Sequence, residues 1–110
     1  MNNIRLDQYF ILREFQCRCC GVVKIRKLLI ERLHVLRVSL KRPIFVTSGY
    51  RCKKHNTDID GNINSAHMRW AAADIRVTGI SPLLVMVAAK RAGFKNVYCS
   101  VAENFTHCGL

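Results

Sequence analysis

The sequence predicts an α+β fold, in which a small antiparallel sheet is flanked by two main helices. Three observations predict it: a helical leucine period over residues 24–40, a strict alternation over residues 71–77, and the order helix, strand, loop, strand, helix, strands. A chain of 110 residues fits one compact domain, here residues 1–110. Its balance of 50% apolar and 23% charged residues excludes a disordered tail or a coiled-coil rod.

The first half of the chain predicts one long helix and one strand. Between residues 24 and 40 the leucines recur at three- and four-residue steps, and Pro43 ends the helix. Residues 44–47 form a β-rich run that leads into a Ser-Gly-Tyr-Arg turn at residues 48–51. Residues 53–66 are polar and predict a loop that carries function.

The second half predicts a strand, a helix and a hairpin. From Ala71 to Val77 apolar residues alternate with a second set that includes Asp74, so the two sets occupy opposite faces of a strand. Ser81 and Pro82 are an N-cap and a first helical residue, and Gly93 ends the helix. Residues 96–101 and 105–108 are the final strands, joined by a turn at residues 102–104.

The charge is the first indication of a partner. A net charge of +11 favours a polyanion, which includes nucleic acid, an anionic membrane and a bacterial envelope. Aromatic residues make up 8% and lack the stacking pattern of single-strand binders. No stretch is long enough for a membrane span, and the first residues lack the apolar core of a signal peptide. We therefore expect synthesis in the cytoplasm, unless a signal has been trimmed.

Six cysteines allow several interpretations. Cys17, Cys19 and Cys20 lie within one short segment, whereas Cys52 and two others stand apart. In the absence of a secretion signal, free thiols or metal ligation are expected before disulfides. The triplet and Cys52 can form a small metal site or a redox pair, or serve as small buried hydrophobic residues. A basic nucleic-acid-binding domain that uses the triplet for zinc is a further alternative.

Two histidines and one aspartate suggest a metal site. His67 precedes the alternating segment, and Asp74 lies on its minority face, where a carboxylate needs a cation or several hydrogen-bond donors. His107, on the last predicted strand, can supply a third ligand. Three ligands of this kind suit Zn²⁺ with an open fourth position, but by spacing alone they also suit a non-haem iron triad or no metal.

Three groups of motifs occur in order along most of the chain, and together they resemble the motifs of a known protein family. Residues 47–56 read Thr-Ser-Gly-Tyr-Arg-Cys-x-x-His-Asn, residues 65–74 contain Ser-x-His and Ala-x-Asp, and residues 105–107 read Phe-Thr-His. They resemble the successive signatures of the M15 zinc peptidases, which include D-alanyl-D-alanine carboxypeptidases and phage L-alanyl-D-glutamate endolysins. The opening segment, residues 10–17, is also similar to small members. The resemblance implies a fold like that of the hedgehog and DD-peptidase proteins.

The resemblance also implies roles for individual residues. His67, Asp74 and His107 match the ligands of one catalytic Zn²⁺, Arg51 matches the arginine that binds substrate and polarises the scissile carbonyl, and Ser65 matches a polar residue that orients ligand or substrate. The implied function is hydrolysis of peptide bonds in bacterial peptidoglycan, of either the carboxypeptidase or the endopeptidase type. Such an enzyme acts at the cell wall if it is a phage-type lysin, and no nucleic-acid partner is expected.

The chain also departs from the family pattern. Trp70 stands where the pattern has glycine, and His107 is followed by Cys108 and Gly109 instead of x-Asp. Asn104 replaces the acid that many members place three residues before the final histidine, which leaves Glu103 as the candidate general base. These departures favour an alternative: a catalytically degenerate, zinc-binding member that acts as a cell-wall-binding or structural module.

Overall fold

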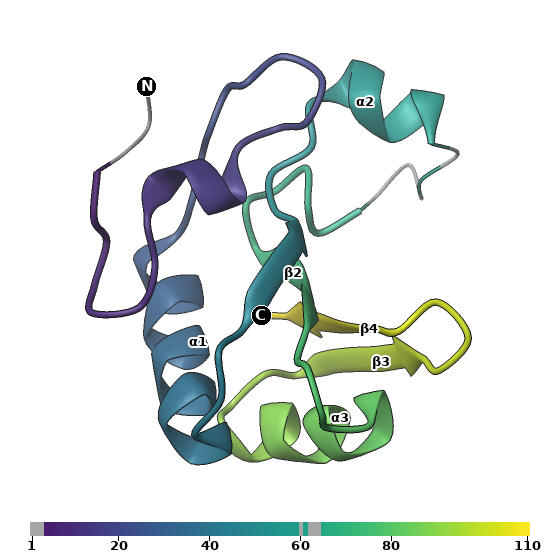
Figure 1. The fold of residues 1–110 in the computed structure, drawn as a ribbon. Coiled ribbons are helices and arrows are strands. Elements are labelled where there is room, and N and C mark those ends of the chain that lie inside the picture. The colour runs from purple at the N-terminus through teal and green to yellow at the C-terminus, as the bar shows by residue number, and fades with distance from the viewer. Residues whose placement is uncertain (1–3, 60, 62–64) are drawn as a thin grey trace.

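The computed structural model describes residues 4–59, 61 and 65–110. Its helices and strands, drawn in Figure 1, follow one another as η1 (Leu12–Phe15), α1 (Lys27–Leu40), β1 (Phe45–Ser48), α2 (Lys53–Asp58), β2 (Ala72–Arg76), α3 (Pro82–Arg91), β3 (Asn96–Ser100) and β4 (Phe105–Gly109). This is the predicted α+β arrangement. Residue 60 and residues 62–64 of the predicted functional loop lie outside the described residues.

The four strands form one sheet in the order β1-β2-β4-β3, and every neighbouring pair is antiparallel. β2 therefore lies between β1 and β4, inside the sheet. In this register Asp74 pairs with His107, and His107 pairs with Tyr98 of β3. Because directly paired residues point to the same face of a sheet, these three side chains share one face.

The hydrophobic core lies on the other face of β2. Ala73 and Ile75 are fully buried in a cluster with Leu33 and Leu36 of α1 and Val85 of α3. Figure 1 shows α1 running along one side of the sheet and α3 beneath β3 and β4. The alternation predicted for this strand is confirmed, because its apolar set enters the core while Asp74 points away from it.

One predicted helix boundary shifts for a local reason, and one short helix was not predicted. α1 begins at Lys27 instead of residue 24, since Arg26 is extended and offers no side-chain cap. The polar loop contains α2, a short helix that was not predicted. The Cys52 sulfur accepts a hydrogen bond from the His55 backbone N–H, which caps this helix. The predicted N-cap of α3 is confirmed, because the Ser81 side chain accepts from the Leu83 backbone N–H.

The N-terminal segment is fixed to the turn that follows β1. Phe15 of η1 is 1% exposed, and its backbone carbonyl accepts a hydrogen bond from the Tyr50 N–H at 2.9 Å. A Cβ atom added at Gly49 would lie 2.6 Å from the Phe15 Cα and 2.7 Å from its carbonyl oxygen. Only glycine allows this approach of two backbones.

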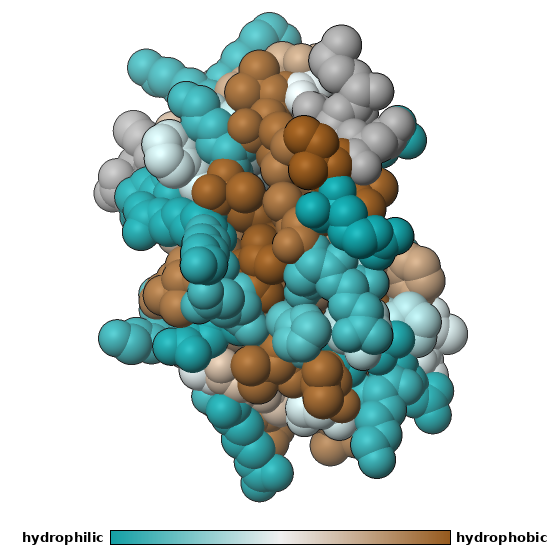
Figure 2. Space-filling model, turned by 90° about the vertical axis from the view of Figure 1, so that its left-hand side faces the viewer, coloured by the Kyte–Doolittle hydropathy of each residue, from teal (hydrophilic) through white to brown (hydrophobic). Residues whose placement is uncertain are grey.

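The outer surface of α1 combines basic and apolar residues. Figure 2, viewed from this side, shows apolar residues in a band between hydrophilic ones, and α1 leaves Leu28, Val35 and Val38 exposed. Among the described residues, none of the helices has the length and apolar character needed to cross a membrane.

We expect Gly49→Ala to lower the free energy of unfolding by about 3 kcal/mol, because the new methyl group meets backbone atoms that cannot rotate away. Gly21→Ala is the matched control. Gly21 has a φ of +74° but open space around its Cβ position, so its cost is about 1 kcal/mol from the backbone alone. Urea unfolding measures both, and equal losses would contradict the close approach.

Candidate metal centre

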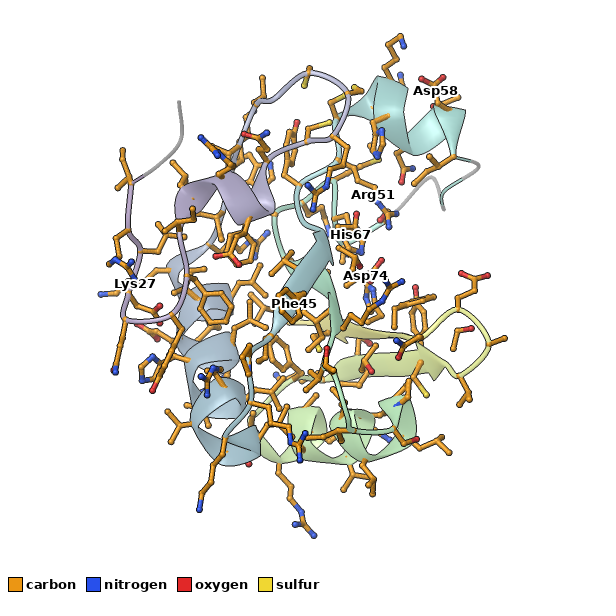
Figure 3. The ribbon with its side chains drawn as sticks, in the orientation of Figure 1. Lys27, Phe45, Arg51, Asp58, His67 and Asp74 are labelled. Carbon is orange, nitrogen blue, oxygen red and sulfur yellow. The ribbon has the colours of Figure 1, made fainter. Side chains whose placement is uncertain are left out.

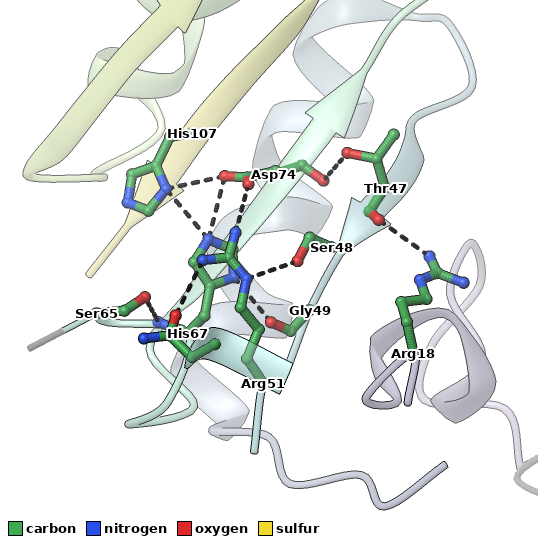
Figure 4. Close-up of polar contacts among 10 residues, drawn as sticks. Arg18, Thr47, Ser48, Gly49, Arg51, Ser65, His67, Asp74 and His107 are labelled. Atoms are coloured by element: carbon green, nitrogen blue, oxygen red, sulfur yellow. Dashed lines mark hydrogen bonds and ion pairs between the residues drawn. The ribbon is translucent and has the colours of Figure 1, made fainter. Parts of the chain in front are cut away.

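Three side chains from separate segments meet at the face of the sheet opposite the hydrophobic core. His67 comes from the turn before β2, Asp74 from β2 and His107 from β4. Figure 3 labels His67 and Asp74, and Figure 4 shows all three side chains together. The His107 Nδ1 lies 2.9 Å from the Asp74 Oδ1, which lies 3.2 Å from the His67 Nε2. The two ring nitrogens are 3.3 Å apart. Sequence reasoning predicted this set, and the structure brings all three residues together.

The orientation of the His67 ring is fixed by a hydrogen bond at the ring nitrogen that does not face Asp74 and His107. Its Nδ1 lies 2.8 Å from the Gly49 backbone carbonyl, which can only accept a hydrogen bond. We therefore assign a proton to Nδ1, and Nε2 is the ring nitrogen directed at the other two residues. Metal-binding histidines in proteins are typically held by such a contact on the opposite ring nitrogen.

The three atoms fit a tetrahedral metal ion. Zn–N distances of about 2.0–2.1 Å in tetrahedral geometry separate neighbouring ligand atoms by about 3.3 Å, close to the distances between these atoms. His67, Asp74 and His107 are 1%, 8% and 6% exposed. A buried group of one carboxylate oxygen and two imidazole nitrogens needs protons or a cation between its lone pairs, and one such ion satisfies all three.

Arg51 holds the other oxygen of Asp74. Its Nη2 donates to the Asp74 Oδ2 at 3.1 Å, while its Nε donates to the Ser48 hydroxyl at 3.1 Å and its Nη1 to the Asn56 side-chain oxygen at 3.4 Å. The guanidinium is therefore fixed beside the three candidate ligands (Figure 4). Arg51 was predicted from the sequence, whereas Ser48 and Asn56 were not.

These contacts shift the pKa of Asp74. Burial alone raises the pKa of this carboxyl group, but hydrogen bonds from His107 and His67, together with their charges, outweigh burial and hold the pKa well below its usual value. The carboxylate is therefore ionised in the folded protein at neutral pH.

A cleft of about 340 Å³ opens onto two of the three residues, His67 and His107. Ser65, Arg69 and Tyr98 are among the residues that line it, together with His67, His107 and Arg51. The Ser65 hydroxyl accepts a hydrogen bond from the His67 backbone N–H at 3.2 Å, so its described contact is with the backbone of a candidate ligand. The Tyr98 ring stacks on the His107 ring, with centroids 4.4 Å apart and planes 6° from parallel.

Tyr98 has no motif around it in the sequence. The final hairpin is the feature that could have identified Tyr98 as a site residue. With a turn over residues 101–104, Tyr98 pairs with His107 across the two strands. Because paired residues share a face, this register places an aromatic ring beside a candidate ligand.

Glu103 lies at the tip of the hairpin between β3 and β4. It is exposed, its backbone N–H donates to the Ser100 hydroxyl, and its carbonyl accepts from Arg76. The residues that line the cleft do not include it. Asn104 beside it has a φ of +55°, a conformation that asparagine tolerates well. The role of Glu103 as a general base stays a prediction.

Trp70 occupies a position whose backbone favours glycine. Its φ of +62° is in the left-handed region, which costs an ordinary residue about 1–2 kcal/mol. The ring fits because it lies at the surface, 40% exposed, where the Lys24 ammonium sits 5.2 Å from its centroid. The bulky side chain is therefore accommodated outside the cleft lining.

The structure also brings together Cys17, Cys19, Cys20 and Cys52, whose sulfur atoms lie within 4.8 Å of one another. All are free thiols. Burial raises the pKa of the Cys17 thiol, but hydrogen bonds from the backbone N–H groups of Cys52, Cys19 and Cys20 outweigh it and lower this pKa to about 6. Hydrogen bonding with Cys52 raises the pKa of Cys19, because the neighbouring sulfurs compete for one negative charge.

Comparison with known families gives one finding. The model of a family described as Peptidase M15 matches residues 8–109, a range that contains every residue of the candidate metal centre. Among curated proteins, none matches this chain.

The low pKa of Asp74 makes a prediction about the metal-free protein. A depressed folded-state pKa contributes stability that is present above the unfolded-state pKa, near 3.8, and is lost as the pH falls towards the folded-state value. We expect Asp74→Asn to lower the free energy of unfolding by about 2 kcal/mol at pH 7. Denaturant titrations should show that this difference shrinks below about pH 4, and a constant difference down to pH 2 would contradict the assignment.

Proposed function

Because the chain belongs to the Peptidase M15 family, whose members are metal-dependent and usually use zinc, we propose that it is a zinc-dependent peptidase acting on the peptides of bacterial peptidoglycan. Family membership supports a zinc metallopeptidase-like function. The observation that carries the proposal is the convergence of the His67 Nε2, Asp74 Oδ1 and His107 Nδ1 to within 3.3 Å of one another.

In this proposal His67, Asp74 and His107 hold one Zn²⁺, with the cleft at its open side. A zinc ion in such a site supplies Lewis acidity and lowers the pKa of water to about 7. Arg51, fixed by Ser48 and by the second oxygen of Asp74, provides a guanidinium for the charge that develops on the scissile carbonyl oxygen. Ser65 supports the backbone of the turn that presents His67.

The lining of the cleft supports a substrate with carboxylate groups. Arg51 and Arg69 contribute two cationic side chains, and the described residues of the lining include neither Asp nor Glu. Peptides of the bacterial wall carry several free carboxylates, and a protein with a net charge of +11 is attracted to an anionic wall. These features are compatible with both the carboxypeptidase and the endopeptidase type of cleavage.

One observation favours a second candidate function. A zinc peptidase needs a general base near its water, yet Glu103 is at an exposed hairpin tip and the described cleft lining has no carboxylate. The alternative is a zinc-binding module that holds wall peptides in the cleft without cleaving them. Binding without hydrolysis would distinguish it from the enzyme.

Hydrolysis can be tested directly. We expect the zinc-loaded protein to shorten purified muropeptides, as followed by mass spectrometry, and Arg51→Ala to lower kcat/KM by about 100-fold because it removes charge stabilisation at the carbonyl oxygen. Arg91→Ala, at the exposed end of α3, is the matched control and should keep wild-type activity. Muropeptides that bind but stay intact would contradict the peptidase and support the binding module.

The general base gives a separate prediction. If Glu103 reaches the site when substrate is bound, Glu103→Gln should lower kcat by about 100-fold or more with little change in KM, since the amide cannot accept a proton. Glu31→Gln on the exposed side of α1 is the control. Unchanged kcat in Glu103→Gln would show that another group accepts the proton.

A further inference from the structure

We propose that Cys17, Cys19, Cys20 and Cys52 form a second metal site, in which four thiolates hold one structural Zn²⁺ that joins the N-terminal segment to the turn carrying Arg51. This cluster is separate from the candidate metal centre and shares no residue with it. The inference depends on the geometry of the four sulfurs and not on any catalytic activity.

The distances between the sulfurs suit one tetrahedral ion. Cys17 and Cys19 have their Sγ atoms 3.6 Å apart, Cys17 and Cys52 also 3.6 Å, and Cys19 and Cys52 3.3 Å. The Cys20 sulfur completes a group whose members are all within 4.8 Å. Zn–S bonds of about 2.3 Å in a tetrahedron separate the sulfurs by about 3.8 Å, so a small expansion of the cluster accommodates the ion.

One pair of the four cysteines has the spacing of known zinc sites. Cys17 and Cys20 are separated by two residues, which is the Cys-x-x-Cys spacing found in many structural zinc sites. The turn between them closes on itself, because the Cys17 N–H donates to the Val22 carbonyl at 2.7 Å and the Gly21 N–H donates to the Cys17 carbonyl at 2.9 Å. Gly21, with a φ of +74°, permits this turn.

Backbone groups around the cluster stabilise thiolates. The Cys52 N–H donates to the Cys17 sulfur at 3.5 Å, and the His55 N–H donates to the Cys52 sulfur at 3.4 Å. Such contacts outside the ligand set hold the sulfurs in position and favour their charged form. Four thiolates with one Zn²⁺ carry a charge of about −2, and the basic residues Arg18 and Lys53 adjoin the cysteines in the sequence.

The exposure of the cysteines suits a structural ion. Cys17 is buried and Cys52 partly buried, whereas Cys19 and Cys20 are exposed, so an ion can enter from solvent and be enclosed from below. All four are free thiols, and one metal ion can engage all four sulfurs at once. Soft thiolates select zinc over magnesium or calcium, and four of them leave no open position for chemistry.

A metal ion at this site would brace a segment that has no regular secondary structure. Between η1 and α1, residues 16–26 contain no helix or strand, yet this segment supports β1 through Arg18, which donates to the Val46 and Thr47 carbonyls at 3.0 and 3.3 Å. Cys52 directly follows Arg51. A metal ion bound to both segments therefore fixes the outer edge of the sheet and the backbone that carries the arginine.

Metal content and cobalt absorption test the proposal on the full-length chain. After purification under reducing conditions and reloading with ZnCl₂, we expect the wild-type chain to hold about one zinc ion more than the double variant Cys19→Ser, Cys52→Ser, whatever the candidate metal centre holds. Cys99→Ser, a partly buried cysteine outside the cluster, is the control and should keep the wild-type zinc content.

Loading with CoCl₂ identifies the ligands, because thiolate-to-cobalt charge transfer gives an intense near-ultraviolet band that histidine and carboxylate ligands do not give. This band should persist in His67→Ala and in Cys99→Ser, and disappear in the double cysteine variant. The wild-type spectrum decides the matter even if the double variant fails to fold. Absence of the band in the reduced, cobalt-loaded wild-type protein would overturn the proposal.

Discussion

The carboxylate of Asp74 is the group on which the arrangement of the site depends. One of its oxygens contacts His67 and His107, and the other accepts from Arg51. A buried carboxylate is costly unless it is paired and hydrogen-bonded, so β2 can hold Asp74 at 8% exposure only when these partners are in place. The same contacts leave one oxygen and two ring nitrogens directed at a common point. The arrangement that allows the carboxylate to be buried is therefore also the arrangement that can bind a cation.

The position of β2 inside the sheet explains how one strand can serve both core and site. Ala73 and Ile75 enter the hydrophobic core, while Asp74 between them faces the opposite side. Because side chains alternate along a strand, a register slip of one residue would bury the carboxylate among apolar side chains and expose the core residues. Pairing with β4 then places His107 directly opposite Asp74, and pairing of β4 with β3 adds the Tyr98 ring behind the imidazole.

The sequence was sufficient for features encoded in local patterns. The alternation around Asp74, the Ser81 cap and the final hairpin all appear where local physics predicts them, and the ordered motifs identify the three candidate ligands. Features that depend on how segments meet were not predictable: the Arg51 contact with Asp74 and the stack of Tyr98 on His107. A cluster of the cysteine triplet with Cys52 was one of several alternatives, and the structure brings these sulfurs together. The short helix α2 was missed because a cysteine sulfur caps it, which ordinary capping signals do not include.

The segment from Gly49 to Cys52 connects the cysteine cluster to the candidate metal centre. The Gly49 carbonyl fixes the ring of His67, Tyr50 bonds to the backbone of Phe15, Arg51 holds Asp74, and Cys52 joins the other thiols. These four consecutive residues contact the candidate metal centre and the N-terminal segment alternately. Any displacement of the N-terminal segment therefore moves the backbone that orients His67 and Arg51. A chain of this size has few helices and strands to brace such a turn, so a cross-link at Cys52 is an effective way to hold it rigid.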